Sequence, residues 1–150
     1  DVVQNWHKIK QSEKNNTGKD SVLDSVPDKL PALMRAYMIA DRTSKAGIDQ
    51  YSTSHLMEDL EAKLEELKSS LSSQDKKMID RQCGDFLFTV VNFVRSGGIH
   101  PEPSLAGNVK DFEVRFKRVE KQIADSGRKL EDVPQPEKDR IWEKSKEESA

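Results

Sequence analysis

Five leucines recur along one segment of the chain at the spacing of an α-helix. Leu56, Leu60, Leu64, Leu67 and Leu71 follow one another at steps of four, four, three and four residues. Because an α-helix completes a turn in about 3.6 residues, these steps place all five side chains on one face. Ser52 to Ser54 supply hydroxyl groups that can cap the start of this helix. The segment therefore predicts an amphipathic helix that needs other helices to cover its apolar stripe.

The rest of the chain also divides into helices. The sequence predicts a short helix over residues 1–10, a polar linker, and a helix after Pro31 that ends near Gly47. Further helices are expected over residues 75–95, stopped by Gly97-Gly98, and over residues 105–126, and a short one after Pro136, with Pro101 and Pro103 in a loop. The helix over 105–126 carries an apolar face made of Phe112, Phe116, Val119 and Ile123. No run of short alternating strands is present. We therefore predict an all-α fold, with an N-terminal helix and linker at 1–22 and a helical domain at 23–150.

Composition excludes several classes of function. The 150 residues include 35% charged residues and carry a net charge of −2, which gives no overall attraction to nucleic acid. One cysteine, Cys83, rules out a disulfide framework within the chain and favours a reducing, cytoplasmic setting. The longest apolar stretch, residues 86–94, is too short to span a membrane, and no signal peptide opens the sequence.

The expected helix over 75–95 carries a polar stripe on an otherwise apolar surface. Gln82, Asp85, Thr89 and Asn92 are spaced three, four and three residues apart and share one face. Buried polar groups need partners, so the stripe indicates either a satisfied hydrogen-bond network or a ligand or metal site. If Glu66 of the leucine helix faces Asp85, two helices present acids to one point, which suits a hard cation such as Mg²⁺.

Basic residues gather in the last third of the chain. Trp142 and Lys146 are four residues apart and share a helical face. An aromatic ring beside a cation can stack a base and hold a phosphate, whereas the alternative is a packing anchor beside solvated lysines.

Several segments, in this order, resemble the MazG nucleoside triphosphate pyrophosphohydrolases. They are residues 23–36, Gly84 to Asn92, Arg115 to Glu120, and the pair Ile141-Trp142. The order and spacing are similar to those of the C-terminal MazG domain over nearly the whole chain. Residues 5–10 resemble the join between the two tandem domains of full-length members.

The resemblance implies a four-helix-type bundle that forms a homodimer. It also implies hydrolysis of nucleoside triphosphates to monophosphate and pyrophosphate with Mg²⁺, which would neutralise the triphosphate and activate a water molecule. The family holds this metal with a Glu-Glu-x-x-Glu motif on one helix and a Glu-x-x-Asp motif on the next. By the same resemblance, the nucleotide-binding residues here are Lys10, Arg115, Trp142 and Lys146.

The chain departs from the family pattern at the metal site. The first motif falls on residues 62–66, where Ala62 and Lys63 replace two acids, and in the second Gln82 replaces the acid. The surviving candidate catalytic and metal-binding residues are Glu66 and Asp85. Lys63 would place an ammonium group where a divalent ion should lie, and could pair with Asp85 or Glu66 instead. We therefore expect weak or lost hydrolysis; the alternative is an inactive dimerisation or nucleotide-sensing module.

Overall fold

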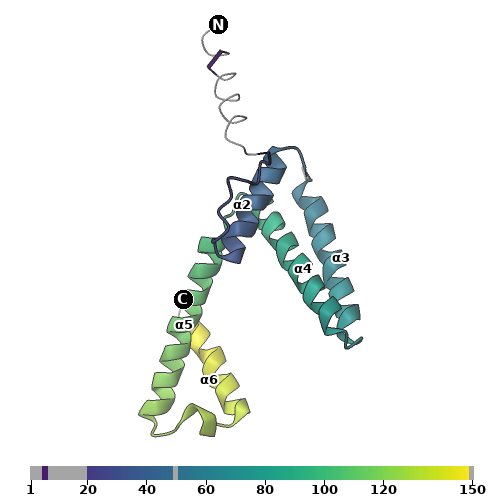
Figure 1. Ribbon diagram of the computed structural model, residues 1–150. Coiled ribbons are helices and arrows are strands. Elements are labelled where there is room, and N and C mark those ends of the chain that lie inside the picture. The colour runs from purple at the N-terminus through teal and green to yellow at the C-terminus, as the bar shows by residue number, and fades with distance from the viewer. Residues whose placement is uncertain (1–4, 7–19, 49–50, 149–150) are drawn as a thin grey trace. The chain divides into compact units, whose positions relative to one another are not determined.

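The computed structural model describes residues 5–6, 20–48 and 51–148, and every regular element in these ranges is helical (Figure 1). The all-α class predicted from the sequence is thus confirmed. The helix expected over residues 1–10 lies outside the described residues, apart from residues 5 and 6. The chain forms two compact units, Asp1–Glu102 and Pro103–Ala150. In the described part of the chain, no helix has an apolar stretch long enough to cross a membrane.

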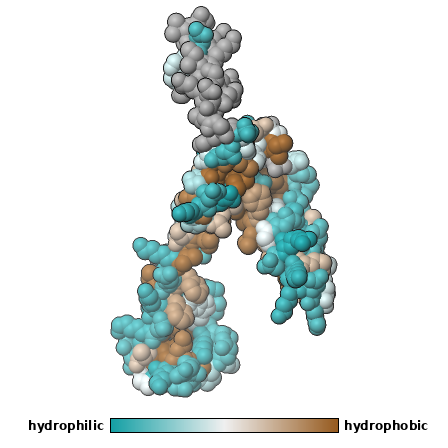
Figure 2. All heavy atoms as spheres, in the orientation of Figure 1, coloured by the Kyte–Doolittle hydropathy of each residue, from teal (hydrophilic) through white to brown (hydrophobic). Residues whose placement is uncertain are grey.

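Over residues 20–48 and 51–100, the first unit is built from the helices α2 (Ala32–Lys45), α3 (Thr53–Leu71) and α4 (Lys76–Ser96). A short turn reverses the chain after α3, so that α3 packs along α4, and α4 also packs against α2 (Figure 1). Figure 2 shows apolar side chains gathered where α2 meets α4, whereas polar side chains cover the outer face of α3. The predicted leucine stripe is only partly covered, because Leu56 is buried but Leu64 and Leu71 are exposed.

Side-chain caps and glycine fix the ends of these helices where the sequence indicated. Ser52 Oγ accepts a hydrogen bond from the backbone N–H of His55, and Asp75 Oδ1 accepts one from that of Met78. These bonds satisfy amide groups that have no partner within the helix. Gly47, just after α2, has a φ of 96°, which a side chain would disfavour.

The second unit is a helical hairpin in which α5 (Pro101–Asp125) is followed by the 3₁₀ turn η1 (Leu130–Asp132) and then by α6 (Gln135–Glu147). Its hydrophobic core comprises the buried residues Val119, Ile123 and Val133, against which Leu130, Ile141 and Trp142 pack. The first two of these core residues belong to the predicted apolar face of α5. The sequence pattern therefore identified the side of α5 that α6 covers.

The prediction of a loop at Pro101 and Pro103 is wrong, because both residues lie in the first turn of α5. Proline is tolerated there, since the first amide groups of a helix have no intrahelical acceptor and the fixed φ of proline suits the helix. The glycines Gly97 and Gly98 do end α4, as expected.

Candidate functional site

The face between α3 and α4 holds an ion pair at the position of the predicted metal site. Lys63 Nζ on α3 lies 2.7 Å from Asp85 Oδ2 on α4. The Lys63 side chain is 23% exposed and that of Asp85 is 55% exposed. The sequence left both Asp85 and Glu66 open as partners of Lys63, and Asp85 is the one that lies within hydrogen-bond distance.

Several acids surround the Lys63 ammonium group. The hydrogen bond that Lys63 donates to Asp85 is the largest cause that raises the pKa of Lys63 above 10.5, and the charges of Asp59, Asp85 and Glu66 raise it further. Partial burial lowers the pKa of Lys63, but this effect is smaller than the combined effect of the acids. Lys63 therefore remains charged at neutral pH and supplies a positive charge to this cluster of acids.

These residues do not fit a divalent ion. Glu66 is exposed on α3, and Asp85 is held by Lys63. In the described ranges no three histidine, cysteine or acidic side chains converge as metal ligands would. A magnesium ion prefers several oxygen ligands in octahedral geometry, and an ammonium group within hydrogen-bond distance of one of the two carboxylates opposes it.

The other members of the polar stripe on α4 have separate partners. Thr89 Oγ1 donates to the Asp85 carbonyl, and Asn92 Oδ1 accepts from Arg95. Gln82 Oε1 is buried and has no hydrogen-bond partner among the described residues. The stripe is thus neither one continuous network nor a set of converging ligands. The unpaired oxygen of Gln82 lies at the position where the resemblance to MazG enzymes predicts an acid.

We expect Lys63→Met to lower the free energy of unfolding of the first unit by roughly 1 kcal/mol or less, because Asp85 is half exposed to water. The difference from the parent should be constant from neutral pH to about pH 10 and should shrink as the pH rises through the raised pKa of Lys63, where the parent also loses the charge. Urea unfolding at several pH values measures this difference. Lys68→Met is the matched control, since Lys68 pairs with Glu65 on the same helix at a more exposed position. If both variants lose the same free energy of unfolding, the ion pair of Lys63 with Asp85 is no more stabilising than an exposed pair within one helix.

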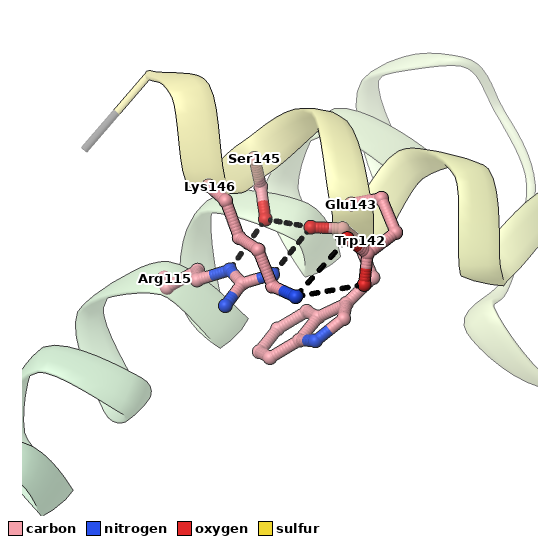
Figure 3. A network of polar contacts seen from close by, with 5 residues as sticks. All are labelled: Arg115, Trp142, Glu143, Ser145 and Lys146. Carbon is pink, nitrogen blue, oxygen red and sulfur yellow. Dashed lines mark hydrogen bonds and ion pairs between the residues drawn. The ribbon is translucent and has the colours of Figure 1, made fainter. Parts of the chain in front are cut away.

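The second unit brings together three of the four predicted nucleotide-binding residues (Figure 3). The Arg115 guanidinium lies over the Trp142 indole, with Cζ 3.8 Å from the ring centroid. Arg115 Nε donates to Ser145 Oγ at 2.7 Å, and Nη2 donates to the Trp142 carbonyl at 2.5 Å. Arg115 on α5 is thereby fixed to the last turns of α6. Lys10, the fourth predicted residue, lies outside the described residues.

Lys146 is also engaged. Its Nζ lies 2.9 Å and 3.0 Å from the two carboxylate oxygens of Glu143, as Figure 3 shows. Glu143 and Ser145 were not predicted from the sequence as partners of these residues. The spacing of Glu143 and Lys146 could have indicated their pair, because residues three apart are neighbours on a helix. No local pattern indicates the contact of Arg115 with Ser145, which are 30 residues apart.

A pocket of about 390 Å³ opens beside Trp142 in the second unit. Its lining comes from α5, η1 and α6 and consists of Phe112, Phe116, Val119, Leu130, Gln135, Lys138, Asp139 and Trp142. The apolar members on α5 follow the predicted stripe. The polar members on α6 were missed, because exposed charged residues at the start of a helix are common and carry no signal of a pocket.

Relatives of this sequence are nucleoside triphosphate pyrophosphohydrolases by name. The chain is 33% identical, over 94% of its length, to the nucleoside triphosphate pyrophosphohydrolase/pyrophosphatase MazG of Thermotoga maritima, of which it covers 54%. It is 29% identical, over 97% of its length, to the nucleoside triphosphate pyrophosphohydrolase of Escherichia coli K12, of which it covers 56%. The chain is thus similar, over nearly its whole length, to proteins that carry the MazG pyrophosphohydrolase name. It spans about half the length of these two curated relatives.

A third relative has a name that states no activity. The chain is 34% identical, over 98% of its length, to the uncharacterized protein YabN of Bacillus subtilis, of which it covers 30%. No family model matches the chain. The similarity to MazG proteins thus rests on the named relatives, which match nearly the whole chain.

Proposed function

We propose that this chain is a MazG-family domain that binds nucleoside triphosphates. We further propose that it hydrolyses them to monophosphate and pyrophosphate weakly or not at all. The observation that carries the proposal is the ion pair between Lys63 and Asp85, at 2.7 Å, on the face where the family places its metal. Hydrolysis of this kind needs a cation that neutralises the triphosphate and activates water. An immobile ammonium group can neutralise charge but cannot activate a bound water molecule as a divalent ion does.

The site assignments are part of the same proposal. Glu66 and Asp85 are the remaining acids of the catalytic and metal site, and Lys10, Arg115, Trp142 and Lys146 are the nucleotide-binding residues. Lys146 already pairs with the Glu143 carboxylate, and Arg115 donates to the Ser145 hydroxyl and the Trp142 carbonyl. A nucleotide phosphate would therefore compete with Glu143 for Lys146, whereas the guanidinium chiefly holds Trp142 in place.

We also propose a homodimer in the cytoplasm that binds neither nucleic acid nor a membrane. Leu105 and Val109 continue the apolar stripe of α5 beyond the part that α6 covers, and they are 52% and 45% exposed. Apolar side chains are also visible along α5 in Figure 2. Such a stripe favours burial against another protein surface. An inactive dimerisation or nucleotide-sensing module is the alternative, and it is favoured by the same ion pair.

The test is a pyrophosphate-release assay with the purified chain, GTP or ATP, and Mg²⁺ or Mn²⁺. We expect release at or near the rate of the Asp85→Asn variant, because the metal site is incomplete. Calorimetric titration with an α,β-methylene nucleoside triphosphate then separates nucleotide binding from a purely structural role. Steady release in the parent that Asp85→Asn abolishes would overturn the proposal of weak or lost hydrolysis.

A further inference from the structure

The pocket between α5 and α6 has aromatic walls. Phe112 and Trp142 have ring centroids 5.2 Å apart, and Phe116 and Trp142 have centroids 6.5 Å apart. The two phenylalanine rings are nearly parallel, with an interplanar angle of 8°. Together these rings line an open pocket whose volume of about 390 Å³ falls within the usual range for small-molecule sites. Such walls favour a flat, aromatic ligand.

Trp142 is held in position from outside this pocket. Arg115 stacks on the indole and donates to the Trp142 carbonyl, and Ser145 Oγ also donates to that carbonyl, but Arg115 and Ser145 do not line the pocket. A guanidinium stacked on a ring and hydrogen-bonded to the same residue limits the rotation of that side chain. Trp142 is therefore preorganised, which lowers the entropy that a stacked ligand would lose.

The rim of the pocket is polar and lies on the first turns of α6. Gln135 Nε2 donates to Asp139 Oδ1 at 2.8 Å, which orients the carboxylate and leaves Oδ2 as an acceptor. Lys138 also lines the rim, and its ammonium group has no hydrogen bond or ion pair with the described residues. An apolar side chain from another protein would leave these groups without partners. A flat ligand with hydrogen-bond donors on its edge satisfies them.

We propose that this pocket is a nucleobase subsite that prefers guanine, read by Asp139. A carboxylate only accepts hydrogen bonds, and guanine presents two adjacent donors, N1–H and the 2-amino group. Adenine presents the acceptor N1 beside its 6-amino donor, so its lone pair would face the carboxylate. Lys138 adds a cation near the guanine O6 or a phosphate. The inference rests on the proposed nucleotide binding and adds its base preference.

Fluorescence of Trp142 tests the subsite in the full chain. The two tryptophans are Trp6 and Trp142, so Trp6→Phe leaves Trp142 as the reporter. In this background we expect the α,β-methylene analogue of GTP to quench the emission and to bind about tenfold more tightly than the ATP analogue. Asp139→Asn should remove this preference, because the amide donates where the carboxylate accepts. Phe112→Ala should weaken both analogues, and Asp132→Asn is the matched control for an exposed acid outside the pocket.

Two results overturn the subsite and differ from a failure of nucleotide binding itself. If calorimetry detects binding but the two analogues bind equally, or Asp139→Asn and Asp132→Asn behave alike, the pocket is not a guanine subsite and the proposed function stands. If neither analogue gives heat or quenching at millimolar concentration, nucleotide binding and the subsite both fail. The proposal is supported if the chain prefers the GTP analogue, if Asp139→Asn abolishes this preference, and if Asp132→Asn retains it.

Discussion

Restoring the missing acids in one variant, Ala62→Glu, Lys63→Glu and Gln82→Glu, is expected to produce pyrophosphate release that depends on a divalent ion. The three changes remove the ammonium group that holds Asp85 and complete both family motifs around Glu66 and Asp85. Because a bound metal ion stabilises developing charge by several kcal/mol, we expect release on the order of a hundredfold faster than in the parent. A continuous pyrophosphate assay with Mg²⁺ or Mn²⁺ measures the rates.

The same variant gives a readout that does not depend on turnover. Without metal, five carboxylates on the facing surfaces of α3 and α4 repel one another, whereas the parent has an ion pair there. The melting temperature of the metal-free variant should therefore fall below that of the parent. Mn²⁺ should raise it again in the variant and leave the parent unchanged, since an ion that binds only the folded state stabilises it.

Two further variants control this experiment. Lys63→Met alone removes the ammonium group without supplying acids, so it should not gain activity. Adding Asp85→Asn to the triple variant should remove both the metal-dependent melting shift and the turnover. If Mn²⁺ already stabilises the parent through Asp85, then Lys63 does not exclude metal and the explanation offered for weak hydrolysis is incorrect.

The sequence predicted most helices because their ends and faces depend on local chemistry. The spacing of the leucines predicted which face of α3 is apolar. Ser52 indicated where α3 begins, and Gly47 indicated where α2 ends. The error at Pro101 arose because proline opens helices as readily as it interrupts them, and local sequence does not separate the two cases. Coverage of each apolar face depends on other elements, so exposure of Leu64 could not be predicted from the stripe.

The candidate site was predictable only in part. The motif comparison showed that Lys63 stands among acids, but both Asp85 and Glu66 were open as its partner, because a long lysine side chain can reach either. The choice of Asp85 follows from how α3 packs on α4, which is a tertiary feature. The contact of Arg115 with Ser145 and the pocket beside Trp142 arise in the same way from the packing of α6 on α5.

Truncating Ile123 to alanine is expected to cause the largest loss of stability of any single change in the second unit. Ile123 is 2% exposed and packs at the centre of a core that otherwise contains few buried residues. Removal of three buried carbon atoms loses their transfer free energy and leaves a cavity, which together cost about 2–5 kcal/mol. Urea unfolding followed by Trp142 emission in the Trp6→Phe background reports on this unit directly, since Trp142 packs against the same core.

The matched control for Ile123→Ala is Val114→Ala on the same helix. Val114 is 52% exposed, so its truncation removes little buried surface, and alanine favours the helix more than valine does. We expect its unfolding midpoint to stay within error of the parent or to rise slightly. Equal losses in the two variants would mean that the hairpin of α5 and α6 is not stabilised by the core around Ile123. Because the aromatic pocket is built on that core, Ile123→Ala should also weaken quenching by the GTP analogue, whereas Val114→Ala should leave it unchanged.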